Sequence, residues 1–331
     1  MTEILPRRLV KARRSGAPGP GSASPSAKLR KAVLFTGYSC NNRCGFCVDY
    51  EKRHIPDKTT ATLIREMARA KAWGADYLEL IGGEASLRAD FLKLVRSAKK
   101  IGFRDIATAT NGRLFAYPDF ARAALRAGLT SIIFSVHGHT AALHDRLTAA
   151  AGSFAQLCDG VRSLRALGFK RLHANATVVR QNYRFLPRLG ELFLRLGFCG
   201  VELIFVDPTY GGAHRSFSKF VPRISLAAPW MRRCLDIGRA AGTRSWFVRY
   251  VPLCHFQGYE DQVSETMERR TFAATLHWAP DFKNEDVAGS RAAVARAKPG
   301  SCGGCRLSGE CEGIWREYLR VYGAAELRPV L

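Results

Sequence analysis

The chain has 331 residues, of which 47% are hydrophobic and 10% aromatic, so it can bury a sizeable core and is not a wholly disordered polymer. No run approaches the ~20 apolar residues that span a bilayer, and the first residues lack the apolar stretch of a secretory signal; we expect a cytoplasmic protein with no membrane partner. The net charge of +23 would attract polyanions such as RNA or acidic peptides, but a solvated Arg-rich surface explains it equally well.

A Gly-, Pro- and Ser-rich stretch without apolar period fills residues 12–30, so we predict a disordered basic tail over residues 1–30. From residue 31, a β-rich apolar run followed by an amphipathic stretch recurs. The predicted strands are 32–36, 77–81, 106–110, 131–135, 173–179 and 201–206. The predicted helices between them are 60–73, 91–101, 119–127, 153–167 and 185–196, and left-handed caps are expected at Gly74, Gly102, Gly128 and Gly168. This alternation predicts an α/β fold with a parallel sheet, either a barrel or a doubly wound sheet.

The rhythm breaks after residue 208. Residues 210–213 look like a loop, 226–241 like a helix, and 255–300 are irregular. A cysteine-rich tail begins near residue 300 and ends in a predicted helix over 312–321. We place a domain boundary near residue 215, which separates a core over 31–215 from a second unit over 216–331.

Three cysteines, Cys40, Cys44 and Cys47, follow the first predicted strand, at the end of the sheet where parallel α/β folds build their sites. Ten cysteines in a chain without an export signal indicate metal rather than disulfides. A [4Fe–4S] cubane is usually held by four thiolates, one per iron, so three cysteines leave one iron open to another ligand. Zinc is the alternative, with His54 as a fourth ligand.

This C-x3-C-x2-C loop, with Phe46 before the third cysteine, resembles the hallmark of the radical S-adenosylmethionine (SAM) superfamily. Gly82-Gly83-Glu84 follows the second strand, Thr110-Asn111 ends the third and Ser135 ends the fourth, as in that family. The resemblance covers residues 32 to about 206. It implies a partial (β/α)6 TIM-type barrel, a [4Fe–4S] cluster on the three cysteines and SAM on its open iron. The implied SAM-contacting residues are Phe46, Gly82, Gly83, Glu84, Thr110, Asn111, Ser135, Asn175 and Arg180.

The residues at the carboxyl ends of the predicted strands allow more than one interpretation. Gly82 and Gly83 would let the backbone approach a ligand closely, and Glu84 would accept the SAM amino group or stabilise a helix dipole. His137 and His139 could touch the substrate or move protons; they could equally shape the turn through hydrogen bonds. No catalytic residue can be assigned.

The second group of cysteines, Cys302, Cys305 and Cys311, resembles the core of the SPASM/twitch extensions that bind auxiliary [4Fe–4S] clusters. Trp315 stands where full SPASM domains carry a further cysteine, so we expect a single auxiliary cluster with Cys254 as its fourth ligand. A structural zinc site is the alternative. We assign the remaining cysteines, Cys158, Cys199 and Cys234, to packing.

The resemblance implies reductive cleavage of SAM to a 5′-deoxyadenosyl radical that abstracts hydrogen from a substrate, with a low-potential donor of flavodoxin or ferredoxin type as partner. We expect a peptide substrate, as in the maturation of ribosomally made peptides. The alternative is radical oxidation or rearrangement of a small molecule such as a sugar, alcohol or natural product. RNA modification is a third enzymatic alternative, which only the positive net charge favours. A further alternative is that the protein is no enzyme but binds an iron–sulfur cluster or zinc.

Overall fold

The computed structural model describes residues 28–331. Most of the expected disordered tail therefore lies outside the described residues. The expectation is wrong for Leu29 and Arg30, which already belong to the first strand, β1.

A nine-stranded sheet with the order β7-β6-β5-β4-β3-β2-β1-β8-β9 forms the centre of the described part of the chain. Its first eight strands in chain order pair in parallel, and only β9 is antiparallel. The strands are β1 Leu29–Phe35, β2 Tyr77–Ile81, β3 Asp105–Thr110, β4 Ser131–Ser135, β5 Leu172–Val178, β6 Gly200–Phe205, β7 Trp246–Arg249, β8 Phe272–Trp278 and β9 Lys283–Asn284. The α/β TIM-type architecture is confirmed, and the sheet exceeds the six expected strands by β7, β8 and β9.

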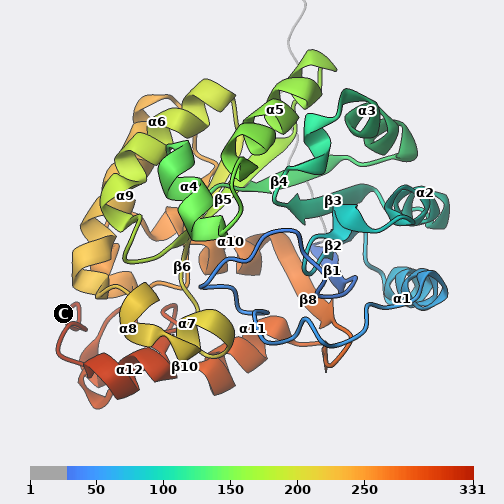
Figure 1. The fold of residues 1–331 in the computed structure, drawn as a ribbon. Helices are drawn as coiled ribbons and strands as arrows, with labels where there is room; N and C mark the ends of the chain where they lie inside the picture. The colour runs from blue at the N-terminus through green and yellow to red at the C-terminus, as the bar shows by residue number, and fades with distance from the viewer. Residues whose placement is uncertain (1–27) are drawn as a thin grey trace, which may run out of the picture.

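Helices cover the outer side of this sheet, while α7, α8 and α12 gather at one end of it (Figure 1). Glycines with positive φ follow the carboxyl ends of α1, α2, α3 and α5, as predicted, because Gly carries no Cβ. The helices are α1 Thr60–Ala72, α2 Phe91–Ile101, α3 Pro118–Ala127, α4 Ala141–Thr148, α5 Ser153–Ala166, α6 Leu186–Leu196, α7 Gly211–Arg215, α8 Phe217–Phe220, α9 Ile224–Ala240, α10 Ser264–Thr271, α11 Val287–Ser290 and α12 Arg316–Tyr322.

Three local expectations after residue 208 are wrong. Residues 210–213 are not a loop throughout, because helix α7 begins at Gly211. Residues 255–300 are not irregular, since they contain α10, β8, β9 and α11. The last helix begins at Arg316 rather than at residue 312, because Ile314 and Trp315 form strand β11, which pairs with β10 (Arg296–Ala297).

Strands from beyond residue 215 extend the core sheet. β7 pairs with β6 and β8 pairs with β1, so both edges of the six-stranded core continue into the later part of the chain. Helix α10 packs against β7 and β8. The sheet therefore contains strands from both sides of residue 215. The domain boundary near this residue stays a prediction.

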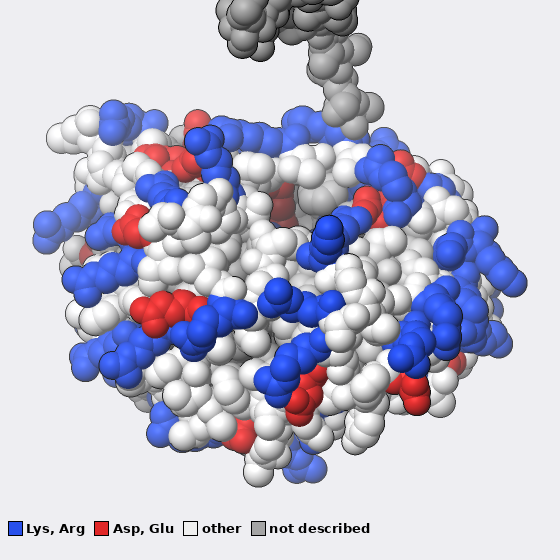
Figure 2. All heavy atoms as spheres, turned by 90° about the horizontal axis from the view of Figure 1, so that it is seen from above, with Lys and Arg blue, Asp and Glu red and all other residues white. Residues whose placement is uncertain are grey.

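Charge is distributed widely over the surface. Figure 2 shows a face on which Lys and Arg side chains outnumber Asp and Glu side chains. Several helices of the barrel end in basic residues, for example Lys99 and Lys100 in α2, where a cation stabilises the carboxyl end of the helix dipole. Among residues 28–331, no helix combines the length and apolarity needed to cross a membrane.

Candidate functional site

The three-cysteine loop leaves the carboxyl end of β1, and its thiols are half-buried. Burial raises the pKa of Cys47 to about 12. Burial also raises the pKa of Cys44, and the negative charges of Cys47 and Cys40 raise it further. Thiols in such surroundings ionise when a metal supplies the positive charge.

Two arginines that the sequence analysis missed hold this loop. The Arg113 Nη1 donates to the carbonyl oxygen of Asn41 at 2.6 Å, and its Nε donates to the Gln156 side chain at 2.6 Å. The Arg53 Nη2 donates to the carbonyl oxygen of Asn42 at 2.7 Å. Both arginines therefore fix the backbone between the first two cysteines. The pattern of the sequence carries no signal for this, because the acceptors are backbone carbonyls.

Phe46, between the second and third cysteines, is only 6% exposed. Its ring meets His137 edge-on, with 4.9 Å between ring centroids, and Phe220 at 6.2 Å. The aromatic side chain therefore anchors the loop in the core of the barrel end. Its contact with SAM stays a prediction.

Gly82 and Gly83 are required by the chain itself. Both have positive φ, and a Cβ on Gly83 would stand 2.2 Å from the carbonyl oxygen of Ser39. The next residue, Glu84, donates its backbone N–H to that same oxygen at 2.7 Å. The two glycines thus allow the end of β2 to contact the segment just before Cys40. This backbone contact explains the need for glycine more directly than the approach of a ligand does.

Glu84 is buried, and its carboxylate binds groups from two loops. Its Oε1 accepts from Ser86 and from the Thr110 hydroxyl at 2.7 Å, while its Oε2 accepts the backbone N–H of Asn111 at 2.6 Å. Burial raises its pKa, and these hydrogen bonds oppose the shift. A carboxylate offers about four lone-pair sites, so Oε2 keeps capacity for one more donor.

Ser135, the last residue of β4, is the direct register partner of Asn175 in the middle of β5, and both are half-buried. The structure therefore brings these two predicted residues together. The Arg180 side chain binds residues outside β4 and β5. Its Nε donates to the carbonyl oxygen of Val221 at 3.0 Å, and its Nη2 donates to the Tyr322 hydroxyl at 2.7 Å. Its guanidinium links the end of β5 to α12.

The two histidines after β4 make different contacts. The His137 Nδ1 accepts the backbone N–H of Thr177 at 3.3 Å, and Asn182 donates to the His137 carbonyl at 3.0 Å. His139 stacks on Phe185, with 5.2 Å between ring centroids. The turn-shaping interpretation therefore has direct support at His137.

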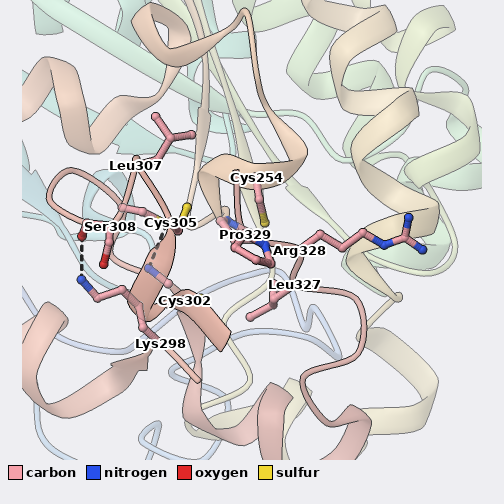
Figure 3. Close-up of a pocket in the computed structure, with 12 residues that line it drawn as sticks. Cys254, Lys298, Cys302, Cys305, Leu307, Ser308, Leu327, Arg328 and Pro329 are labelled. Carbon is pink, nitrogen blue, oxygen red and sulfur yellow. Dashed lines mark hydrogen bonds between the residues drawn. The ribbon is translucent and has the colours of Figure 1, made fainter. Parts of the chain in front are cut away.

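The four tail cysteines converge. Cys254, Cys302, Cys305 and Cys311 line one open hollow, together with Lys298 and residues 327–329 (Figure 3). The backbone N–H groups of Leu253 and Gly313 donate to the Cys311 sulfur at 3.4 and 3.3 Å. Strands β10 and β11 bracket the segment that carries Cys302, Cys305 and Cys311.

The three remaining cysteines differ in their exposure to solvent. Cys158 and Cys234 are buried, as expected for packing residues. The assignment of Cys199 to the core is wrong, because its side chain is exposed; it follows α6 at a turn and its thiol donates to the carbonyl oxygen of Leu172 at 3.2 Å.

The donor sets suit iron–sulfur clusters. The first group offers three thiols beside a carboxylate with an unused lone pair, and the second offers four thiols and no other metal-ligating side chain around its hollow. Across the described residues, no group of three or more His, Cys, Asp or Glu side chains is arranged to hold a single metal ion. A cubane needs only one thiolate on each iron, so its ligands need not converge on one point.

Comparison with protein families matches residues 34–186 to the family described as "Radical SAM superfamily". The matched range contains the three-cysteine loop, Glu84 and the ends of β1 to β5.

Two relatives illustrate the sequence similarity. A "Probable GTP 3',8-cyclase" of Saccharolobus islandicus is 31% identical over 172 residues, which cover 51% of this chain and 54% of the relative. The GTP 3',8-cyclase of Marinobacter nauticus is 32% identical over 157 residues, 46% of each chain. The chain thus spans about half the length of these relatives.

Solved structures share the fold over a longer range. SuiB of Streptococcus suis, bound to its precursor peptide SuiA, superposes with a TM-score of 0.64, covering 88% of this chain and 72% of SuiB at 14% identity. The enzyme anSMEcpe, with bound AdoMet and the Cp18Cys peptide, gives a TM-score of 0.56 over 70% of this chain and 65% of its own, at 15% identity.

Proposed function

We propose that the chain is a radical SAM enzyme with two [4Fe–4S] clusters that modifies a peptide, since its residues 34–186 match the Radical SAM superfamily. Cys40, Cys44 and Cys47 hold the first cluster and leave one iron for SAM. Cys254, Cys302, Cys305 and Cys311 hold the second. The observation that carries the proposal is the gathering of seven of the ten cysteines into these two groups, one of three and one of four.

When bound, the first cluster and SAM supply a one-electron cleavage of the sulfonium to methionine and a 5′-deoxyadenosyl radical, which takes a hydrogen atom from the substrate. The chain's own residues bind and orient these groups. Glu84 receives the SAM ammonium on the free lone pair of Oε2, a charge-assisted hydrogen bond. Arg53 and Arg113 keep the loop between the first two cysteines in one conformation.

We propose Ser135 and Asn175 as contacts for the ribose or carboxylate of SAM; their pairing on neighbouring strands β4 and β5 supports this. Thr110 and Asn111 act through Glu84, since their donors fix its carboxylate. The second cluster has a cysteine for each iron, so electron transfer or support of the site suits it better than direct binding of substrate. A low-potential flavodoxin- or ferredoxin-type protein is the proposed electron donor.

A peptide substrate is supported by the range of the structural likeness. The similarity to SuiB extends over 88% of the chain, well beyond residues 34–186, and SuiB was solved with a precursor peptide. The second candidate is a small-molecule substrate, favoured by the sequence relatives, whose names specify GTP. Incubation with GTP and with any short peptide encoded beside the gene, followed by mass spectrometry of both, separates the two candidates.

The test of the core proposal uses anaerobically reconstituted protein. We expect about eight irons per chain and 5′-deoxyadenosine after dithionite reduction with SAM. Cys44→Ala should abolish that product, and Cys305→Ala should remove about four irons per chain while leaving the first cluster in place. A Cys44→Ala variant that cleaves SAM as fast as the wild type would overturn the assignment, and unchanged iron in Cys305→Ala would favour zinc or no metal in the tail.

A further inference from the structure

The segment that follows α12 folds back over the tail cysteines. Leu327, Arg328 and Pro329 belong to the wall of the hollow that the four cysteines line. Figure 3 shows Arg328 and Pro329 beside Cys254. This segment lies more than 15 residues beyond Cys311 in the chain, so only the fold brings it to the cysteines.

A backbone N–H group of this segment reaches one of the sulfur atoms. The Val330 N–H donates to the Cys305 sulfur at 3.3 Å, and the Arg306 N–H donates back to the Val330 carbonyl at 2.8 Å. These two bonds fix the end of the segment against the residue that follows Cys305 in the chain.

Glu326 anchors the segment. Its carboxylate accepts hydrogen bonds from the Ser225 and Tyr318 hydroxyls, and Arg223 lies 3.7 Å from it. Its carbonyl oxygen accepts from the His255 Nε2 at 2.8 Å. The anchor thus reaches α9, α12 and the residue next to Cys254. The Glu326 side chain is only 10% exposed, so these bonds act with little competition from water.

We propose that residues 326–330 are a working part of the auxiliary cluster site: the Val330 N–H stabilises the thiolate of Cys305, the buried Leu327 excludes water, and Glu326 holds the segment in place. This inference rests on the proposed function, because it requires the second cluster. Hydrogen bonds to cluster sulfurs and exclusion of solvent are the means by which proteins set the potential of such clusters.

The first test compares Val330→Pro with Val330→Ala in the full chain. Proline removes the N–H that donates to Cys305, whereas alanine keeps it. An N–H donor favours the more negative, reduced cluster, so Val330→Pro should lower the reduction potential of the auxiliary cluster, and Val330→Ala should keep the wild-type value. Potentials are read by electron paramagnetic resonance during redox titration, in the complete chain and in a chain carrying Cys40→Ala, Cys44→Ala and Cys47→Ala, where only the auxiliary signal remains.

The second test removes the anchor. Glu326→Gln weakens the bonds to Ser225, Tyr318 and Arg223, so the auxiliary cluster should bleach several-fold faster in air than in the wild type. Glu285→Gln makes the same change at an exposed residue and should bleach at the wild-type rate.

The outcomes are separable. Loss of auxiliary iron in Val330→Pro but not in Val330→Ala supports the inference, as does a lowered potential. Equal potentials in the two Val330 variants, together with wild-type bleaching in Glu326→Gln, would overturn it while the second cluster stands. A wild-type chain with only about four irons, unchanged by Cys305→Ala, would overturn the second cluster itself.

Discussion

Glu84 shows how one side chain joins separate pieces of the site. Its carboxylate binds Thr110 and the Asn111 backbone from the loop after β3, while its backbone N–H binds the segment before Cys40. A buried carboxylate is costly unless its oxygens are hydrogen-bonded. The donors around Glu84 therefore stabilise the charge and fix the direction of the remaining lone pair, which is what recognition of an ammonium group requires.

The buried His144 should make the fold sensitive to acid. Burial lowers its pKa to about 4, against the opposing effect of Asp145, and its Nδ1 accepts the backbone N–H of His137 at 3.2 Å. The unfolded chain takes up this proton below about pH 6.5 and the folded chain only near pH 4. Stability is therefore lost as the pH falls between these values, by about 2 kcal/mol at pH 5.

His144→Asn keeps an oxygen acceptor near the position of Nδ1 and does not titrate. Anaerobic urea unfolding at pH 7.5 and pH 5 should therefore show a loss of stability about 2 kcal/mol smaller in this variant than in the wild type. The exposed His54 offers the control, since His54→Asn should leave the pH dependence unchanged. Identical losses in wild type and His144→Asn would contradict the argument.

Six of the seven cysteines in the two groups could be predicted, because their spacing is local in the sequence and thiols in clusters have few other uses in a reduced chain. Cys254 lies far from the other tail cysteines in the sequence, and only its loop-like surroundings suggested it. Arg53 and Arg113 could not, because they act on backbone carbonyls. Any sequence supplies such carbonyls, so no pattern marks their partners.

At the scale of elements, helix α7 is part of the cysteine loop's support. Gly212 donates its backbone N–H to the Cys47 carbonyl at 2.9 Å. A Cβ on Gly212 would stand 2.0 Å from the Gly45 carbonyl oxygen, and one on Gly211 would stand 2.2 Å from the Val48 carbonyl oxygen. The paired glycines thus allow two backbones to touch, although glycine is a poor helix former.

Gly212→Ala should push α7 away from the cysteine loop without disturbing the rest of the barrel. A displacement of about 1 Å at the reacting centre can cost about 100-fold in rate, so SAM cleavage should fall by about that factor, and iron at the first cluster should decrease. Both are measured after anaerobic reconstitution. Gly309→Ala, where a Cβ meets nothing within 4 Å, should retain wild-type iron and activity. Full iron and activity in Gly212→Ala would show that the contact is dispensable.

The elements after residue 208 were the hardest to predict, for a physical reason. β8 pairs with β1, and the two strands are separated by well over two hundred residues. Only Leu276 and Trp278 of β8 are buried, and β7 has four residues, so neither strand has a long periodic pattern. Their place in the sheet depends on tertiary pairing, whereas the first five strands each precede an amphipathic helix and carry their own signal.

At the scale of the molecule, a network of ion pairs connects one edge of the parallel sheet, β6 and β7, to the cysteine-rich tail. Arg249 on β7 binds Glu202 and Glu268, each at 2.7 Å, and Glu268 on α10 also binds Arg291 at 3.3 Å. Arg291 also forms an ion pair with Glu312, the residue after Cys311, at 2.8 Å. Burial alone would raise the pKa of Glu268, but Arg249 and Arg291 lower it to about 2. The stabilisation that Glu268 contributes is therefore complete above pH 4.5 and is lost as the pH falls towards 2.

Arg291→Met tests whether this network holds the barrel and the tail together. The Arg291 and Glu312 side chains are 8% and 9% exposed. Removing the cation leaves carboxylates buried without their partner, which costs on the order of 3 kcal/mol. Urea unfolding should show that loss, and the cooperativity of the transition should fall if the tail detaches before the barrel. Arg320→Met breaks the exposed pair with Glu317 and should cost less than about 1 kcal/mol. Equal losses in the free energy of unfolding for the two variants would contradict this role of the ion pairs. The tail would then be held against the barrel by apolar contacts alone.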